Sequence, residues 1–230
     1  MHDFGEIIYL DLHKTGSSYI SEFLKTCCLL TEKKFHKHDW IRENYDSNKF
    51  YFISIRHPFS LYSSLYRFGL DGKGDVRNRL RASNNLSAYS SFNSFADFLL
   101  DERNANLLGY GYNQFYAQHI GFMSFRFLKL SLQFPHKKID YALKTKGNIE
   151  DLHNLLITDL EIKNEDLNGG LRELATEIHP YYFRQDAVID FLSRTPKINA
   201  SNTTVEKHDV MSDTTLSILR NKERLLLSKY

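Results

Sequence analysis

A short stretch of basic and hydroxyl-bearing residues, 13–18, has the composition of a phosphate-binding loop and reads HKTGSS. The preceding residues, 7–12, form an apolar run with the length and composition of a buried strand. A helical pattern follows the loop, with apolar residues at Ile20, Phe23 and Leu24. The first N–H groups of a helix have no partner within the helix, and the helix dipole favours an anion beside them. A strand, a short loop and a helix in this order therefore predict a site for a phosphate group.

The side chains of this loop suit an anionic ligand. Gly16 permits a close approach of the backbone, and Lys14 supplies a full positive charge. Ser17 and Ser18 add hydroxyl donors at the start of the predicted helix. The alternative interpretation is an ordinary helix N-terminus that follows a strand and binds no ligand.

The order of residues in the loop distinguishes it from a Walker A motif. That motif requires G-x-x-x-x-G-K-[ST], whereas here Lys14 precedes the glycine. The loop resembles instead the 5′-phosphosulfate loop of the sulfotransferases, commonly P-K-T-G-S/T-T/S, with His13 in place of the usual Pro. In that family the loop binds 3′-phosphoadenosine 5′-phosphosulfate (PAPS). The resemblance implies that Lys14 contacts the leaving 5′-phosphate. It also implies that Thr15, Gly16, Ser17 and Ser18 hold the oxygens of the 5′-phosphate and of the sulfuryl group.

A second pair of residues, Arg56 and Ser64, is spaced like another signature of the same family. Arg56 ends a predicted buried strand, and Ser64 stands eight residues later in a predicted helix that begins near Pro58. In the sulfotransferases this Arg and Ser bind the 3′-phosphate of PAPS, and the planar guanidinium suits paired contacts with phosphate oxygens. Taken by itself, the pair would favour a strand-end arginine in a surface ion pair and a solvent-facing helical serine, but its spacing of about 40 residues after the first loop favours the resemblance.

The sequence His36-Lys37-His38 lies between these two motifs and offers a candidate general base. An imidazole can accept a proton near neutral pH. The pair resembles the His-x-His of the glycosaminoglycan 2-O-sulfotransferases, in which the second histidine acts as the base. The resemblance implies that His38 is the base and that His36 supports it or contacts substrate. Two surface histidines in a charged run, or a zinc site without recognisable further ligands, are the alternatives.

The rest of the sequence predicts strands and helices around these motifs. Further strands are expected at 34–36, 49–55 and 138–144, and further helices at 94–101 (with a possible cap at Ser94), 149–160 and 212–228. Residues 70–93 predict a long loop or lid with some helix. The segment 177–192 predicts one helix or two, broken at Pro180. Aromatic residues crowd 109–127, either as core or as a wall for substrate.

A segment before the last predicted helix extends the resemblance. It contains Asn199 and Ser201, and carbohydrate sulfotransferases commonly carry such an Asn-x-Ser step where the chain loops over the nucleotide. The resemblance therefore implies that Asn199 and Ser201 help to bind the cofactor. It covers nearly the whole chain, although the two nucleotide motifs are its specific parts.

The composition indicates a globular protein of one domain, residues 1–230. Hydrophobic residues make up 42% of the chain, and 17 Phe and 14 Tyr can build a sizeable core. A net charge of +2 argues against a strongly basic nucleic-acid binder. The adjacent Cys27 and Cys28 suggest no disulfide framework, which favours a reducing compartment. Neither a membrane span nor a signal peptide is recognisable, so we expect a cytoplasmic protein, with an excised catalytic domain as the alternative.

The resemblance implies a PAPS-dependent sulfotransferase of the α/β class. The expected fold is P-loop-NTPase-like, with three layers and a central parallel sheet flanked by helices. The expected acceptor is a hydroxyl group of a carbohydrate. No metal is expected, because the family works without one and no Asp stands at a Walker B position. The alternatives are a Mg²⁺-dependent kinase of the same broad architecture and a nucleotide- or glycan-binding module without catalysis.

Overall fold

The computed structural model describes residues 1–41, 45–146, 148–194 and 210–230. Within these ranges the chain divides into two compact units. The first contains the described parts of Met1–Arg56, Lys129–Lys138 and His153–Ala200, and the second those of His57–Leu128, Ile139–Leu152 and Ser201–Tyr230. The single domain predicted for residues 1–230 stays a prediction.

Among the described residues, the first unit contains a five-stranded sheet with the strand order β3-β1-β2-β4-β5. The strands are β1 His2–Asp3, β2 Ile7–Leu10, β3 Lys34–Phe35, β4 Phe50–Ile55 and β5 Leu160–Lys163. β2, β4 and β5 run parallel, whereas β1 is antiparallel to both of its neighbours. The predicted α/β class is confirmed, and the sheet is mixed rather than parallel throughout.

The antiparallel strand β1 is absent from the sequence-based expectations, and a tight turn produces it. The chain reverses between β1 and β2 at Gly5, whose φ of +92° lies in the left-handed region that glycine tolerates. Phe4 N donates to Ile7 O at 2.9 Å, and Asp3 Oδ1 accepts from Gly5 N at 2.7 Å. A strand of two residues is too short for an alternating apolar pattern to reveal it.

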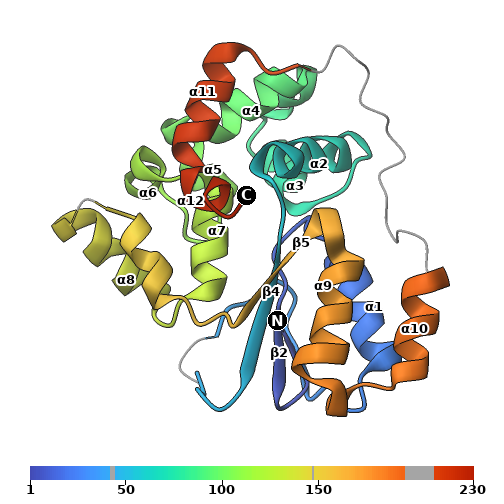
Figure 1. Cartoon of the computed structure of the whole chain (residues 1–230). Helices are drawn as coiled ribbons and strands as arrows, with labels where there is room; N and C mark the ends of the chain where they lie inside the picture. The colour runs from blue at the N-terminus through green and yellow to red at the C-terminus, as the bar shows by residue number, and fades with distance from the viewer. Residues whose placement is uncertain (42–44, 147, 195–209) are drawn as a thin grey trace. The chain divides into compact units, whose positions relative to one another are not determined.

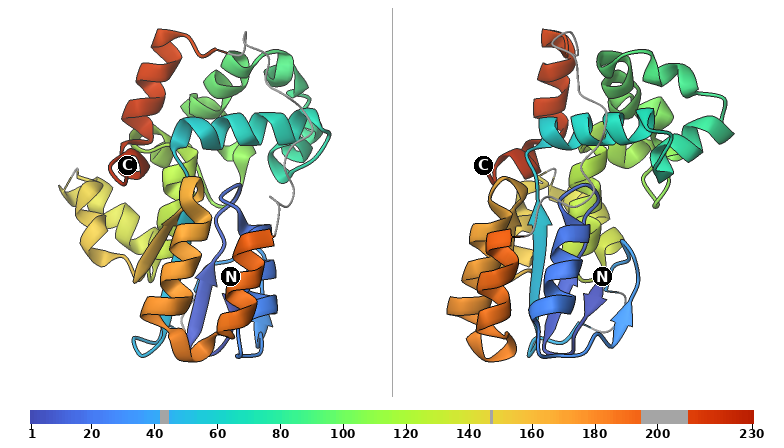
Figure 2. Two further views of the ribbon diagram at one scale, coloured as in Figure 1. Left: turned by 45° about the vertical axis from the view of Figure 1, so that its right-hand side comes forward. Right: turned by 90° about the vertical axis from the view of Figure 1, so that its right-hand side faces the viewer.

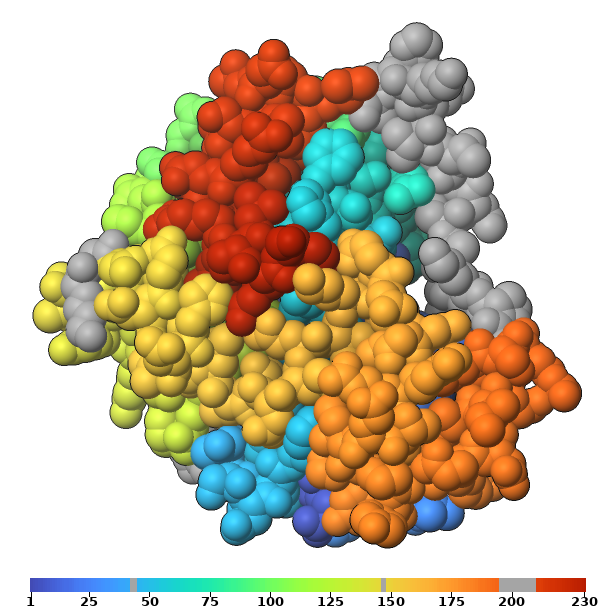
Figure 3. All heavy atoms as spheres, viewed as in Figure 1, coloured from blue at the N-terminus to red at the C-terminus, as the bar shows by residue number. Residues whose placement is uncertain are grey.

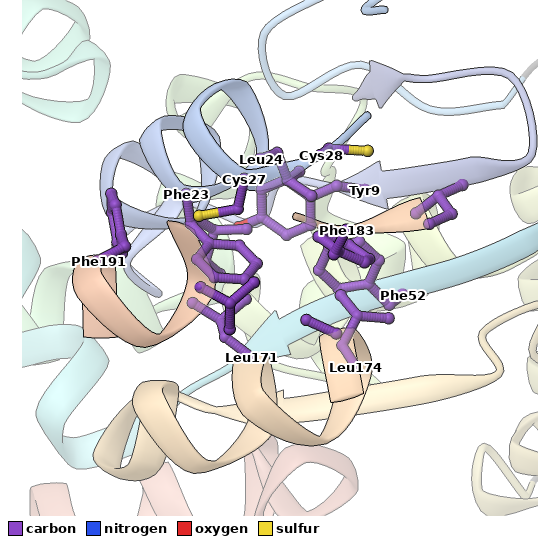
Figure 4. Packing of buried hydrophobic residues seen from close by; sticks show 14 of the residues in the cluster. Tyr9, Phe23, Leu24, Cys27, Cys28, Phe52, Leu171, Leu174, Phe183 and Phe191 are labelled. Atoms are coloured by element: carbon purple, nitrogen blue, oxygen red, sulfur yellow. The ribbon is translucent and has the colours of Figure 1, made fainter. Parts of the chain in front are cut away.

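The helices α1 Ser17–Cys27, α9 Leu167–Glu173 and α10 Gln185–Arg194 lie side by side on one face of this sheet (Figure 1 and Figure 2). Their apolar side chains pack against Tyr9 and Phe52 of the sheet in one buried cluster (Figure 4). The cluster includes Phe23, Leu24, Cys27, Leu171, Leu174 and Phe191. On the outside, the residues of α9 and α10, in orange, form part of the surface in Figure 3. This packing fixes α1, and with it the loop that precedes α1.

The sequence pattern explains why these elements form. All four residues of β2 are buried, as are all residues of β4 except the half-buried Phe50, which is typical of strands covered on both faces. Buried side chains recur along one face of α1, at Tyr19, Ile20, Phe23, Leu24 and Cys27. The predicted strands at 7–12, 34–36 and 49–55 are confirmed with boundaries that differ by one or two residues.

The segment 177–192 is interrupted at Pro180, as one of the two sequence interpretations expects. A π-helical turn, η6 Leu174–Ile178, ends before the proline, and a short 3₁₀ turn, η7 Pro180–Tyr182, follows. α10 then begins at Gln185. Proline lacks the N–H that a continuous helix needs, so the chain starts again after it. The remaining short turn of this unit is η5 Asn164–Asp166.

In the described residues, the second unit consists of helices and their connections. These helices are α2 Pro58–Leu70, α3 Asp75–Ala82, η1 Leu86–Ser90, α4 Phe92–Leu100, η2 Glu102–Asn104, α5 Ala105–Leu108, α6 Gln114–His119, η3 Ala142–Lys146, α11 Asp213–Lys222 and α12 Arg224–Leu227. Three further elements are divided between the two units: α7 Phe122–Ser131, α8 Pro135–Tyr141 and η4 Glu150–Leu155. None of the helices in the described ranges combines the length and apolar character that crossing a bilayer requires.

A buried carboxylate, Glu223, ties three parts of the second unit together. Its Oε1 accepts from the Tyr62 hydroxyl at 2.7 Å and from Met123 N at 3.0 Å. Its Oε2 accepts from Ser124 N at 2.7 Å. Glu223 thereby links the junction of α11 and α12 to α2 and to the first turn of α7. The two short helices replace the continuous helix predicted at 212–228.

Two sequence predictions are wrong. Residues 138–144 form no strand: they lie in α8 and η3, where Ile139, Ala142 and Leu143 are buried at helical spacing. The helix predicted at 149–160 is reduced to η4, because the chain from Leu160 onward pairs with β4 as strand β5. Pairing with a neighbouring strand thus outweighs the local helical pattern.

The polar and aromatic middle of the chain is more ordered than its sequence suggests. Residues 70–93 contain α3 and η1. The next helix, α4, begins at Phe92 and is capped by Ser91, whose Oγ accepts from Ser94 N at 3.0 Å, so Ser94 is not the cap. Most of the aromatic rings of 109–127 belong to the core, with Tyr112, Tyr116, Phe122, Phe125 and Phe127 buried.

Candidate functional site

The residues of the predicted phosphate loop and Arg56 meet at one edge of the sheet in the first unit. The loop follows β2, and Arg56 follows β4, its parallel neighbour. Arg56 Nη1 donates to the main-chain oxygen of Lys14 at 3.3 Å. The carboxyl ends of adjacent parallel strands therefore bring the guanidinium of Arg56 to the backbone of the loop that precedes α1. This is the edge at which open α/β sheets generally bind ligands.

The backbone of the loop is bent by two residues with positive φ. Lys14 has φ +64° and Gly16 has φ +90°, and Gly16 is the N-cap of α1. A Cβ placed on Gly16 would lie 2.5 Å from Leu167 Cδ1 and 3.0 Å from Asn164 Nδ2. Glycine is thus required by its own conformation and by the packing of the segment that starts α9.

The side chain of Thr15 is used inside the protein. Its hydroxyl donates to Leu12 O at 2.8 Å and lies 2.6 Å from Ser54 Oγ. Ser54 Oγ in turn lies 2.7 Å from the hydroxyl of Tyr9. Each hydroxyl has one proton, so the directions follow: Tyr9 donates to Ser54, Ser54 to Thr15, and Thr15 to Leu12 O. Burial raises the pKa of Tyr9, so its hydroxyl stays a donor at any ordinary pH.

This chain of hydroxyls defines what each loop residue can offer a ligand. Thr15 is fully buried and anchors the loop to β4, so its contribution to a ligand is a main-chain N–H. Ser17 is half-buried and Ser18 is exposed, both in the first turn of α1. Their hydroxyls and the N–H groups of that turn are the donors that a phosphate would meet.

His38 is held against the end of β2 by Asp11. The backbone N–H of His38 donates to Asp11 Oδ1 at 2.8 Å. The ring nitrogen Nδ1 lies 2.9 Å from Asp11 O and 3.2 Å from Asp11 Oδ2. The ring also stacks on His13, with centroids 3.5 Å apart and an interplanar angle of 25°. The candidate base therefore lies directly beside the loop that carries Lys14.

These contacts assign the proton of the neutral His38 ring. A main-chain oxygen and a carboxylate accept hydrogen bonds and donate none, so Nδ1 must carry the proton. Nε2 then keeps its lone pair and can accept a proton from a substrate. Asp11 is buried, with 1% of its surface exposed. Asp11 is not among the residues predicted from the sequence, where its one signal is a carboxylate inside the apolar run 7–12.

Four other residues are predicted from the sequence to belong to the site. His36 precedes His38 by two residues, and its side chain is exposed. Ser64 lies on α2 in the second unit and is half-buried. Asn199 and Ser201 lie outside the described residues. The residues that the structure brings together are therefore those of the loop 13–18, Arg56, His38 and Asp11.

Two further findings bear on the site. Within the described ranges, no three His, Cys, Asp or Glu side chains are grouped as a metal ion would require. Comparison of the chain with models of protein families, with curated proteins and with solved structures gave no match.

Proposed function

We propose that the protein is a PAPS-dependent sulfotransferase that acts on a hydroxyl group of a carbohydrate. The observation that carries this proposal is the contact between Arg56 Nη1 and the main-chain oxygen of Lys14. It joins the two stretches that resemble the sulfotransferase motifs, although they are 42 residues apart in the sequence. We further propose that the mixed α/β sheet is part of a three-layer, P-loop-like arrangement and that the protein is cytoplasmic.

The residues at the sheet edge fit the two anionic groups of such a nucleotide. The first turn of α1, with Ser17 and Ser18, offers N–H and hydroxyl donors to a 5′-phosphate, and Lys14 adds charge. Arg56 offers a guanidinium to a 3′-phosphate, with Ser64 proposed as its partner. Thr15 contributes by holding the loop to β4. We propose that Asn199 and Ser201 complete the nucleotide site.

When bound, PAPS supplies an activated sulfuryl group, and the protein has to orient it and move one proton. His38 Nε2 would take the proton of the acceptor hydroxyl as the oxygen of that hydroxyl bonds to sulfur. Lys14 would offset the charge left on the 5′-phosphate as its bond to sulfur breaks. His36, which is exposed and precedes the base by two residues, would support the base or contact the acceptor. Positioning and electrostatic stabilisation account for most of the rate in transfers of this kind.

The experiment that tests the proposal compares two ligands in Arg56→Ala. 3′-Phosphoadenosine 5′-phosphate and AMP share the 5′-phosphate and differ in the 3′-phosphate. An Arg–phosphate contact is typically worth about 1.5–3 kcal/mol, so the affinity for the first ligand should fall about tenfold or more while AMP changes little. Calorimetric titration measures both. Arg56→Lys keeps the charge but loses the planar fork, so its affinity for 3′-phosphoadenosine 5′-phosphate should lie between those of the wild type and Arg56→Ala.

The pair of ligands also separates recognition from distortion of the loop. If removal of Arg56 merely disturbed Lys14 and its neighbours, both ligands would lose affinity equally, because both use the loop. Arg172→Ala, at an exposed arginine of α9, is the matched control for the loss of one positive charge. Equal losses for the two ligands in Arg56→Ala would remove the basis of the proposal.

A further inference from the structure

We infer that Asp11 is a positioning residue for His38, an inference that rests on the proposed function of His38 as the base. Asp11 makes three contacts with this residue, one to its backbone and two to its ring. His38 itself has φ +55°, in a region that a residue with a Cβ seldom occupies. A residue held there must be fixed by its surroundings, and here the contacts with Asp11 supply that constraint.

The two carboxylate oxygens of Asp11 have different tasks. Oδ1 accepts from His38 N at 2.8 Å and from the nitrogen of Met1 at 2.6 Å, which are contacts to the backbone. Oδ2 lies 3.2 Å from Nδ1 of the His38 ring. Oδ1 thus holds the segment in place, and Oδ2 acts on the imidazole. A substitution that changes Oδ2 and keeps Oδ1 separates the structural task from the electrostatic one.

Oδ2 makes Nε2 a better proton acceptor. A negative charge within about 4–6 Å stabilises the protonated form of an imidazole. The proton taken at Nε2 leaves the ring positively charged, and Asp11 offsets that charge from the opposite side of the ring. The charged or titratable groups that also face this pair include the stacked His13, whose protonation would oppose that of His38, the nitrogen of Met1 on Oδ1, and His2, which interacts electrostatically with Asp11. Base and carboxylate form the pair that a general base commonly needs.

Because the main-chain oxygen of Asp11 also contacts the His38 ring, we expect loss of the Asp11 charge to weaken the base without abolishing activity. This oxygen accepts from Nδ1 at 2.9 Å whatever the side chain is, so it continues to favour the tautomer whose proton is on Nδ1 and not on Nε2. Asp11→Asn keeps an oxygen at the position of Oδ1 and places an NH₂ group at the position of Oδ2. The charge is lost, and because Oδ1 keeps its contacts to the backbone we expect the variant to fold. We expect a weaker base, not the complete loss that follows when a catalytic histidine is forced into the wrong tautomer.

The experiment measures His38 directly by ¹⁵N NMR of histidine-labelled protein in the wild type and in Asp11→Asn. The titration of His38 should move to lower pH by about one unit in the variant. In a transfer assay, kcat should fall by about 10- to 100-fold with KM little changed, and the acid limb of the pH profile should move the same way. Asp3→Asn is the matched control, because Asp3 Oδ1 accepts a backbone N–H from Gly5.

The outcomes separate this inference from the proposed function. An unchanged His38 titration in folded Asp11→Asn would overturn the role of Asp11. If that variant did not fold, the wild-type spectra would still decide, since Nδ1 must be the protonated nitrogen of neutral His38. Protonated Nε2 would overturn the inference. If the wild type transferred no sulfuryl group to any acceptor, the proposed function would fall, while the titration would still support or overturn the coupling of Asp11 to His38.

Discussion

The buried hydroxyls of Tyr9, Ser54 and Thr15 form a chain behind the loop. We expect Tyr9→Phe to destabilise the wild type but to stabilise the Ser54→Ala variant. Tyr9 donates to Ser54, and Ser54 donates to Thr15. All three side chains are fully buried. Tyr9→Phe in the wild type removes one hydrogen bond. In Ser54→Ala, the same change removes a hydroxyl that has already lost its acceptor.

The magnitudes follow from the number of hydrogen bonds broken and the number of donors stranded. Loss of one internal hydrogen bond costs about 1 kcal/mol, and a buried donor left without a partner costs about 1–3 kcal/mol. Ser54→Ala breaks two bonds and strands the Tyr9 hydroxyl, so we expect a loss of about 2–4 kcal/mol. Tyr9→Phe alone should cost about 1 kcal/mol. Added to Ser54→Ala, it should instead recover about 1–2 kcal/mol, because the stranded donor is gone.

Equilibrium urea unfolding of the four proteins, with similar m values, gives the free energies of unfolding that the cycle requires. Tyr51→Phe is the matched control: Tyr51 is buried on β4, and its hydroxyl accepts from Asp46 N, outside the chain of hydroxyls. Its effect should be the same with and without Ser54. If Tyr9→Phe destabilised both backgrounds equally, the assigned directions of the hydrogen bonds would be refuted.

Three further outcomes are expected. Lys14→Ala should lower the rate of transfer more than it lowers nucleotide affinity, because its charge matters most as the leaving phosphate becomes more negative; an unchanged kcat would show that Lys14 acts in binding alone. His38→Ala should keep the fold and nucleotide binding but lower the rate of transfer by about 10²–10⁴-fold. His36→Ala should lower that rate less. The activity of the wild type should decline as pH falls, because the base becomes protonated. Burial raises the pKa of Glu223 above its ordinary 4.5, so the native state holds this proton more tightly than the unfolded chain does, and stability should decline as pH rises from about 4.5 to the higher native value. Urea unfolding across that range should show a flatter profile for Glu223→Gln, and parallel profiles would contradict the assignment.

The sequence alone predicts the parts of the site that depend on local pattern. The strands before the loop and before Arg56 are apolar runs of the proper length, and α1 shows a clear helical period. Adjacent parallel strands bring their carboxyl ends together, so the proximity of Lys14 and Arg56 follows from the order of elements. The contact between the two residues at 3.3 Å agrees with that inference.

The roles of Asp11 and Thr15 could not be predicted, because they depend on distant partners. Asp11 and His38 are 27 residues apart, and Thr15 and Ser54 are 39 apart. A hydroxyl in a phosphate loop is expected to face the ligand, and nothing local indicates that Thr15 turns inward. His38 adopts a positive φ, and neither a glycine nor a turn signal in the sequence predicts it.

The errors at 138–144 and 149–160 have the same origin. Both stretches are short and mix apolar with charged or polar residues, and such patterns are ambiguous between strand and helix. Leu160 becomes a strand residue because β4 offers an edge for pairing, and Asp159 aligns the chain with that edge. Asp159 N donates to Tyr51 O at 2.7 Å, and Asp159 Oδ2 accepts from Tyr51 N at 2.8 Å. Those bonds connect positions more than 100 residues apart, beyond the reach of a local pattern.

The central claim is that the edge of the sheet beside α1 binds a nucleotide with phosphates at both the 5′ and the 3′ positions. The most direct measurement is the affinity of the wild-type protein for 3′-phosphoadenosine 5′-phosphate, AMP and ATP with Mg²⁺, determined by calorimetry under one set of conditions. We expect the doubly phosphorylated nucleotide to bind at least about tenfold more tightly than AMP, since one charge-assisted contact of about 1.5–3 kcal/mol separates them. Equal affinities for that nucleotide and AMP, or tighter binding of ATP with Mg²⁺, would contradict the claim and favour a kinase-like site.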